Sequence, residues 1–359
     1  MIEEDLSKVA INNMIYFLSE STTTGTNAGN KARMDIDSIL QKKNYIPIQG
    51  PESISRLKHG NKIHFFFKNR KFLKSLIKIP QNEYLIIQYP FLVPYKNKNE
   101  WLDCSFILQK LAKRNKLILF VHDIDQLRFD KSRDNISDLN LATYIVSHNK
   151  NMTNYLIKNK IDKQKIVNLE IFDYLTIKEN VSNHYNDKAL LCYAGNLKKS
   201  EFIYKLPSKL KELNINLYGN GYTGNQVGLN YQGVFPSDKI SSLIRGKYGL
   251  IWDGTRTDSC SGNIGNYLKY NNPHKLSMYL VANMPVIIWN QAAEAAFVKK
   301  YNVGITVSSL DEIPYKVNKI SEKDYLNMSN SVKVVKKKLE KGYFTLNALD
   351  KIESRIKNE

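Results

Sequence analysis

The 359-residue sequence has little cysteine and no long apolar run. Its three cysteines, Cys104, Cys192 and Cys260, lie far apart and form no C-x-x-C pair, so we expect neither a disulfide framework nor a zinc knuckle. No apolar stretch approaches the roughly 18 residues of a membrane-spanning helix. The acidic residues 3–5 are unlike the start of a secretory signal peptide. The sequence therefore predicts a cytoplasmic protein.

Glycine and proline are also sparse, at 17 and 10 residues, which excludes collagenous and low-complexity classes. Acidic residues are outnumbered, since 53 Lys and Arg stand against 34 Asp and Glu and give a net charge of +19. Such an excess attracts nucleic acids, acidic membranes or phosphorylated small molecules. The basic residues are scattered, and no zinc-finger spacing, arginine-rich arm or RNP-like motif accompanies them. We therefore expect no nucleic-acid partner.

Short apolar runs alternate with helical patterns along the chain, which is typical of βαβ units and parallel sheets. Strands are expected over residues 14–19, 84–88, 117–121, 144–147 and 166–169, and again over 190–194, 215–218, 249–252, 286–289 and 304–307. Helices are expected over residues 32–43, 70–79, 104–114, 149–159, 200–206, 236–243, 274–282, 292–301, 321–339 and 346–357. The predicted fold class is therefore α/β.

A polar stretch without periodicity, residues 178–188, is interpreted as an interdomain linker. We expect a Rossmann-like acceptor-side domain over residues 1–178 and a Rossmann-like nucleotide-sugar domain over 188–340. Residues 341–359 are expected to form a helix that packs back on the first domain. Parallel sheets bind ligands beyond the carboxyl ends of their strands. Two facing sheets therefore predict a shared interdomain cleft.

The segment Asn-Asn-Pro-His-Lys opens one predicted helix in the second half. Pro273 suits a first helical turn, and Asn272 suits the N-cap before it. Lys275 then lies beside the positive end of the helix, where a lysine is unfavourable unless a phosphate is bound there. A solvated surface lysine is the alternative. We expect the donor site to include Asn271, Asn272, His274 and Lys275.

Three other strand ends of the second half carry candidate donor contacts. They are Gly195, Asn196 and Lys198 after the first strand, Tyr218 and Gly219 at the second, and Asp253 after the third. A glycine turn with free amides and a lysine suits a diphosphate, a tyrosine could stack on a base, and a carboxylate could bind sugar hydroxyls. Ordinary turns with solvated lysines and a buried tyrosine remain the alternatives.

In the first half, the polar stretch 21–31 is longer than the usual loop of two to six residues between a strand and a helix. Its glycines permit close approach of a ligand, and its hydroxyls offer hydrogen bonds. We expect this loop to shape the acceptor side through Thr24, Gly25, Thr26 and Lys31. A flexible polar loop with an N-cap is the alternative.

A second candidate in the first half is the strand end His122-Asp123-Ile124-Asp125. Asp123 or His122 could act as the general base for a sugar hydroxyl. The D-x-D pair could instead hold a divalent metal, but alternate residues of an extended segment point to opposite faces. A polar strand end without function is the third reading. The D-x-D of Asp35 and Asp37 lies within a predicted helix and is interpreted as helix surface.

These motifs together resemble the bacterial glucosyltransferase 3 family, whose relatives include β-1,6-galactofuranosyltransferases. The resemblance rests on Ala-Gly-Asn-Lys-Ala-Arg-Met-Asp-Ile at 28–36, Phe-Val-His-Asp at 120–123, Tyr-Ala-Gly-Asn-Leu at 193–197, Tyr-Asn-Asn-Pro-His-Lys at 270–275 and Pro-Val-Ile at 285–287. It implies a GT-B fold with a UDP-sugar on the second domain, an acceptor on the first, no catalytic metal or separate cofactor, and a homo-oligomer (dimer or tetramer).

The function expected from the resemblance is transfer of a hexosyl group, with glucose first, from a UDP-sugar to a glycan on a serine-rich adhesin. Galactofuranosyl or other hexosyl transfer to a lipid-linked acceptor at the inner face of the plasma membrane is the alternative. A third reading is a membrane-surface or polyanion-binding module without turnover. It rests on the apolar positions 72, 73, 76 and 77, which lysines border. The same pattern suits a helix packed on a sheet.

Overall fold

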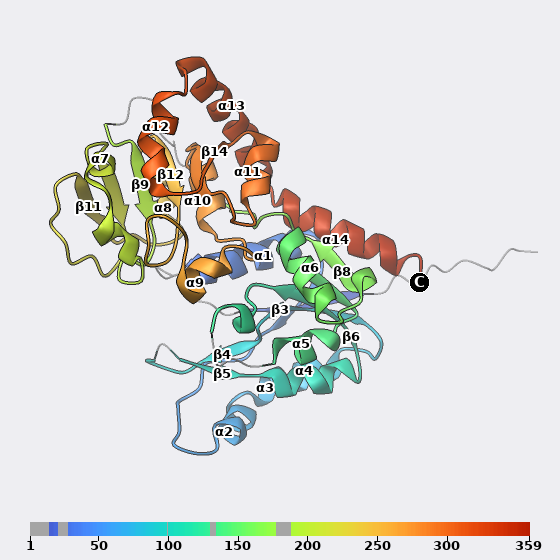
Figure 1. Ribbon diagram of the computed structural model, residues 1–359. Coiled ribbons are helices and arrows are strands. Elements are labelled where there is room, and N and C mark those ends of the chain that lie inside the picture. The colour runs from blue at the N-terminus through green and yellow to red at the C-terminus, as the bar shows by residue number, and fades with distance from the viewer. Residues whose placement is uncertain (1–13, 21–27, 99, 130–133, 177–187) are drawn as a thin grey trace, which may run out of the picture.

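The computed structural model describes residues 14–20, 28–98, 100–129, 134–176 and 188–359 (Figure 1). Its strands are β1 (Ile15–Ser19), β2 (Ile46–Gln49), β3 (Tyr84–Tyr89), β4 (Leu92–Pro94), β5 (Trp101–Asp103), β6 (Lys116–Val121), β7 (Tyr144–Ser147), β8 (Ile166–Asn168), β9 (Leu191–Ala194), β10 (Ile215–Tyr218), β11 (Leu229–Gly233), β12 (Tyr248–Ile251), β13 (Val286–Trp289) and β14 (Gly304–Val307).

Its α-helices are α1 (Ala28–Lys42), α2 (Asn61–Lys68), α3 (Arg70–Lys78), α4 (Ser105–Ala112), α5 (Asn135–Asn140), α6 (Lys150–Lys158), α7 (Ser208–Lys211), α8 (Ile240–Leu243), α9 (Gly262–Tyr267), α10 (Lys275–Val281), α11 (Ala295–Tyr301), α12 (Ile313–Asn318), α13 (Glu322–Leu339) and α14 (Tyr343–Ile356). Residues 201–205, expected as an α-helix, form a 3₁₀-helix instead.

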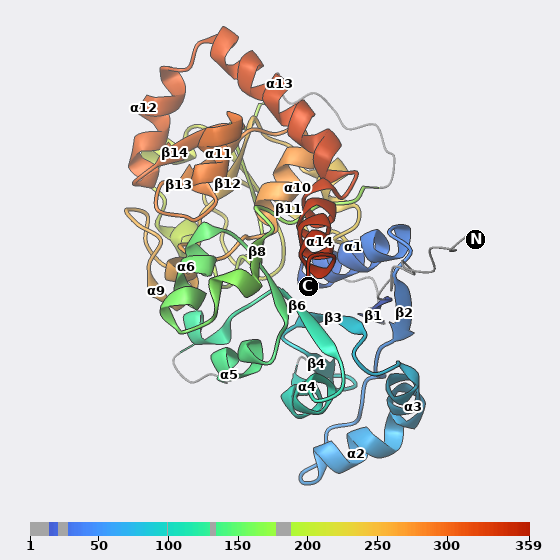
Figure 2. The same cartoon turned by 90° about the vertical axis from the view of Figure 1, so that its right-hand side faces the viewer.

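Two six-stranded parallel sheets organise these elements, one in each half of the chain. The first has the order β2-β1-β3-β6-β7-β8 and the second the order β11-β10-β9-β12-β13-β14. The second order, renumbered from its first strand, is 3-2-1-4-5-6, that of the dinucleotide-binding folds. Helices cover both sheets in the two views of Figures 1 and 2. The predicted α/β fold with two parallel sheets is confirmed.

Both faces of the first sheet are buried, which explains why its strands are almost wholly apolar. Along β6, Ile118 and Phe120 face a cluster that continues into the second half, while Leu117 and Leu119 face the helices on the other side. This is the two-residue alternation of a pleated strand with apolar residues at both positions. The edge strands β2 and β11 were missed because they are mostly exposed and lack such runs.

The last helix, α14, packs against α1 and β8 of the first half, as both views show. Lys43 forms ion pairs with Asp350 and Glu353 of this helix at 2.8 and 3.0 Å. Tyr45 donates a hydrogen bond to Glu353 at 2.6 Å. These contacts join the C-terminus to the N-terminal sheet, so the chain crosses between the two halves a second time.

Candidate donor and acceptor sites at two sheet switch points

The strand order of the second sheet reverses between the neighbouring strands β9 and β12, and ligands bind α/β sheets at such switch points. Gly195 follows β9 directly, and Asp253 follows β12 after one residue. Lys275, the first residue of α10, completes the cluster: its Nζ lies 2.7 Å from Oδ1 of Asp253 and 3.0 Å from the Tyr193 hydroxyl. The fold therefore brings together three sequence-predicted donor residues from three separate segments.

The Lys275 ammonium is held charged in a nearly buried place, since its side chain is only 16% exposed. Burial disfavours the ammonium, but the carboxylate of Asp253 and the hydroxyl of Tyr193 outweigh burial and raise the pKa of Lys275. Burial also raises the pKa of Tyr193 to about 12, so its hydroxyl stays neutral. The lysine is thus a permanent cation whose present partner, Asp253, is itself 20% exposed. An anionic ligand at this edge would meet a preformed positive charge.

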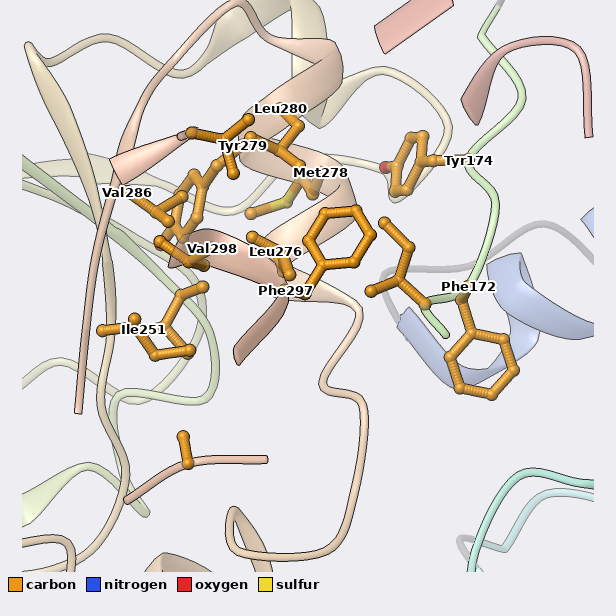
Figure 3. Packing of buried hydrophobic residues seen from close by; sticks show 14 of the residues in the cluster. Phe172, Tyr174, Ile251, Leu276, Met278, Tyr279, Leu280, Val286, Phe297 and Val298 are labelled. Atoms are coloured by element: carbon orange, nitrogen blue, oxygen red, sulfur yellow. The ribbon is translucent and has the colours of Figure 1, made fainter. Parts of the chain in front are cut away.

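Helix α10 is fixed against the switch point by Tyr279, four residues after the lysine. The Tyr279 hydroxyl accepts a hydrogen bond from the Ala194 amide of β9 at 2.9 Å. Its ring lies against Gly249 of β12, where a Cβ would come within 2.2 Å of the ring. Leu276, Met278, Tyr279 and Leu280 pack in the core beside this sheet (Figure 3). Residues four apart lie on one helix face, so the anchored tyrosine places Lys275 at the strand ends.

The turns after β9 and β10 touch closely enough to require glycine. Gly219 has φ +130, and a Cβ there would lie 1.8 Å from the carbonyl oxygen of Gly195. A Cβ on Gly195 would lie 3.2 Å from Cε of Lys275. Within the described chain, the amides of Asn196 and Lys198 have no hydrogen-bond acceptor, and both residues are exposed. The turn that contacts Lys275 through Gly195 therefore has two unbonded amides, and such amides can bind a diphosphate.

Asn272 does not cap α10, contrary to the sequence prediction, because the N-cap residue is His274. Instead Asn272 is 4% exposed and joins the two halves. Its amide donates to Nδ1 of His148 at 2.9 Å, and its side chain donates to the carbonyls of His148 and Glu170 and accepts from Asn149. With these bonds made, its side chain holds the donor loop in place and does not point to a ligand.

The neighbours of Asn272 are also largely internal. The side-chain oxygen of Asn271 and Nε2 of His274 are buried without a hydrogen-bond partner among the described residues. Burial lowers the pKa of His274 to about 3, with the charge of Lys31 as the second cause. Its ring packs against those of Phe172 and Tyr174, whose centroids are 5.8 and 5.2 Å away. His274 is therefore a neutral imidazole with one unused nitrogen at the junction of the two halves.

Tyr218 does not lie where a nucleotide base could stack on it. It is 3% exposed, its hydroxyl accepts from the Arg245 amide at 2.9 Å, and its ring packs on Phe235. The base-stacking prediction is wrong for this residue, because the last residue of a doubly covered strand points into the core. The adjoining Gly219 stays at the strand end.

The first sheet has its own switch point between β1 and β3, and a polar network occupies it. Arg33 of α1 forms an ion pair with Glu20 after β1 and donates to the carbonyl of Gln88 at the end of β3. Gln88, only 1% exposed, donates to Asp37 at 2.7 Å, and Asp37 accepts from Ser19 and the Glu20 amide. Burial raises the pKa of Glu20.

The same network corrects the interpretation of Asp35 and Asp37 as helix surface. Both are buried, at 5% and 7% exposure. Asp35 forms an ion pair with Lys31, whose Nζ also donates to the carbonyl of Leu175 at 2.7 Å. Lys31 is therefore a buried structural cation rather than an exposed acceptor contact. The predicted acceptor residues Thr24, Gly25 and Thr26 lie outside the described residues.

His122 and Asp123 follow β6 at the same edge. Nε2 of His122 lies 2.7 Å from Oε1 of Gln88, and burial, followed by the charge of Arg33, holds the pKa of His122 well below its usual value. This makes His122 a weak base. Asp123 pairs with Arg128 at 2.7 Å and accepts from Tyr267 at 3.2 Å, while burial raises its pKa. With its side chain 35% exposed, Asp123 stays the stronger base candidate.

The contacts of Tyr267 and Asn272 show that the carboxyl edges of both sheets meet. Tyr267 of α9 binds Asp123 and also accepts from the Ile124 amide at 3.0 Å. Sequence reasoning missed Tyr193, Glu20, Arg33 and Gln88 as site residues. Tyr193 and Gln88, each next to last in its strand, could have been found, because a polar side chain near the end of an apolar strand is unusual.

Within the described ranges, no three His, Cys, Asp or Glu side chains gather as a metal site would require. No described helix is both long enough and apolar enough to cross a bilayer. All three cysteines are buried, and none of them forms a disulfide.

Comparison with known proteins connects this geometry to a family. Residues 8–171 match the family model "Glucosyltransferase 3-like, N-terminal domain", and residues 191–352 match "Glucosyltransferase 3-like, C-terminal domain". The chain is 31% identical over 349 residues to the β-1,6-galactofuranosyltransferase WbbI of Escherichia coli K12, covering 96% of this chain and 99% of that one. It is 23% identical to glucosyltransferase 3 of Streptococcus gordonii, covering 69% and 73%.

Solved structures agree on the fold. HepE of Anabaena, in complex with UDP-glucose, has a TM-score of 0.56 at 12% identity, covering 95% of this chain and all of that one. An α-glucosyltransferase in complex with UDP has a TM-score of 0.55 at 10% identity, covering 96% and 100%. The relative at 31% identity over nearly the whole chain sets aside the reading as a module without turnover. The chain belongs to the glucosyltransferase 3-like family and is a glycosyltransferase of the GT-B fold.

Proposed function

We propose that this enzyme transfers a hexosyl group from a UDP-sugar to a hydroxyl of a glycan acceptor. The observation that carries the proposal is the nearly buried Lys275 ammonium at the β9–β12 switch point, against the Gly195 turn in which the amides of Asn196 and Lys198 have no acceptor among the described residues. Negative charge develops on the departing UDP as its bond to the sugar breaks. A fixed cation and oriented amides stabilise such charge without a metal. In free enzyme the carboxylate of Asp253 balances this cation.

The acceptor is assigned to the edge of the first sheet, opposite the lysine. Asp123 is proposed as the base that receives the acceptor proton, since burial raises its pKa and its side chain is 35% exposed. Glu20 is the second candidate, because burial raises its pKa and its side chain is partly exposed. Separate Asp123→Asn and Glu20→Gln variants distinguish them: the base variant should lose transfer while retaining UDP binding.

For the donor sugar, the relative at 31% identity over nearly the full chain supports galactofuranose, while the glucosyltransferases at 23% identity support glucose. We therefore place galactofuranosyl transfer in cell-surface polysaccharide assembly first. Glucosyl transfer to a glycoprotein, the first expectation from the sequence, becomes the second candidate. A lipid-linked acceptor is proposed with the first candidate and a protein-linked acceptor with the second.

The test is a panel of UDP-sugars scored with the full chain for binding and for UDP release. UDP-galactofuranose, UDP-galactopyranose and UDP-glucose are the essential members. Preference for UDP-galactofuranose supports the first candidate, and preference for UDP-glucose supports the second. If none of the UDP-sugars binds or is cleaved, the proposal of a UDP-sugar donor fails.

A further inference from the structure

A basic surface lies at the end of the first half that is farthest from the second sheet. We define the α2–α3 surface as the exposed side chains of α2 and α3. Both views show these two helices at the opposite end of the molecule from β9 to β14 (Figures 1 and 2). Neither the donor residues nor the proposed bases belong to this surface. The function proposed above therefore leaves it unexplained.

The charge of this region is of one sign. Residues 53–82 contain no Asp or Glu, and their eight cations are Arg56, Lys58, Lys62, Lys68, Arg70, Lys71, Lys74 and Lys78. Arg56 pairs with Glu100, and Lys68 lies 3.5 Å from Glu52. Among the residues that the structure describes, the other six form no salt bridge. Their charge is available to an anionic partner.

On α2 and α3, three large apolar side chains stand exposed among these cations: Ile63 at 64%, Phe67 at 61% and Ile77 at 64%. Ile63 and Phe67 are four residues apart and share one face of α2. The guanidinium of Arg70 lies over the Phe67 ring at 4.9 Å, which joins α2 to α3. Arg70, Lys74 and Ile77 then follow at helical spacing on α3. The contact between Arg70 and Phe67 therefore links the exposed cations and apolar side chains of the two helices.

The apolar stripe in the sequence of α3 mostly points the other way. Phe72 and Leu76 are buried in the core of the first half, so they are packing residues. Only Ile77 of that stripe is exposed, and Ile63 and Phe67 come from the preceding helix. The surface that could meet a membrane is thus a different set of residues from the one that periodicity indicates.

We propose that the α2–α3 surface docks on a bilayer containing anionic phospholipid. Its cations would lie against phosphate headgroups while Ile63, Phe67 and Ile77 enter the boundary with the acyl chains. A second copy of this chain is disfavoured, because a two-fold contact would place like charges against each other. A nucleic acid would satisfy the cations but leave the two exposed isoleucines without a partner. The proposal is independent of the donor sugar.

Vesicle flotation of the full chain tests the proposal, with phosphatidylglycerol–phosphatidylcholine vesicles compared with pure phosphatidylcholine. The wild type should float with the anionic vesicles and release as salt rises. Lys71→Gln/Lys74→Gln/Lys78→Gln should bind about 100-fold more weakly, since each cation contributes about fivefold. Ile63→Ser/Phe67→Ser/Ile77→Ser should bind at least about tenfold more weakly at equal charge. Both variants should cleave the donor in solution like the wild type.

The matched control for the charge variant is Lys333→Gln/Lys337→Gln/Lys341→Gln, on α13 and directly after it, which also removes three exposed lysines. It should bind vesicles like the wild type. The proposal is overturned if the wild type does not prefer anionic vesicles, or if the α13 control loses binding equally, since the net charge alone would then explain adsorption. It is also overturned if the α2–α3 variants change the sedimentation mass, which would identify a contact between copies.

Discussion

Replacing Lys275 with methionine removes the ammonium but keeps the length and apolar stem of the side chain. A Cβ on Gly195 would lie 3.5 Å from the Lys275 ammonium, and a hydrogen bond to a charged group contributes about 1.5–3 kcal/mol net. We therefore expect UDP to bind about 10- to 150-fold more weakly. Because charge on UDP grows as the sugar leaves, turnover should fall by a further factor of about 100 to 1,000.

Folding must be separated from function in this experiment. Lys275→Met leaves the Asp253 carboxylate unpaired at 20% exposure, so the variant should lose about 1–3 kcal/mol of unfolding free energy. Adding Asp253→Asn removes the stranded charge and should recover part of this stability without recovering transfer. Calorimetric UDP titration, urea unfolding and UDP-release assays on both variants supply the three readouts. If Lys275→Met binds UDP and turns over within about twofold of the wild type, the phosphate role is refuted.

Three further predictions concern the turns, the metal and the pH dependence. Gly219→Ala should lower the free energy of unfolding, measured in urea, by about 3 kcal/mol or more. The reason is that φ of this residue is +130 and a Cβ would lie 1.8 Å from the Gly195 carbonyl oxygen. An unchanged urea midpoint would contradict this contact. EDTA should leave the UDP-release rate unchanged, and loss of activity that Mg²⁺ or Mn²⁺ restores would return attention to Asp123. Burial lowers the pKa of His148 to about 3, so its contribution to stability is complete above about 6.5 and is lost as the pH falls toward 3. Between pH 7 and 5 the wild type should thus lose about 2 kcal/mol more than His148→Gln, and parallel pH profiles would show that His148 does not titrate in this way.

The histidine prediction has a simple structural cause. Nε2 of His148 is bonded to the Val121 carbonyl at 3.0 Å, and Nδ1 accepts from the Asn272 amide at 2.9 Å. A second ring proton would point at that amide, so the charged form has no place there. The interdomain contact and the donor loop are therefore both expected to loosen in acid, with Asn272 as the link between them.

Much of the fold follows from the sequence because its strands are short, apolar and covered on both sides. Residues 144–147 and 215–218 were predicted to the residue, whereas the exposed edge strands β2 and β11 were not. The sequence alone also singled out Lys275 as a candidate, because a lysine beside a helix N-terminus conflicts with the helix dipole. Strands and helix starts can be predicted from the sequence where the environment of each residue depends mainly on its neighbours in the chain.

The tertiary structure alone decided what surrounds these residues. The partner of Lys275 is Asp253, 22 positions away, and the bonds of Asn272 reach across to the first half. Tyr218 carries no sign in its sequence of being buried. Periodicity in the sequence indicated an apolar stripe on α3. It did not indicate that most of this stripe faces the core, or that α2 exposes Ile63 and Phe67. The sequence thus determined which segments form strands and helices, whereas burial and pairing between distant segments were decided only when the two sheets met.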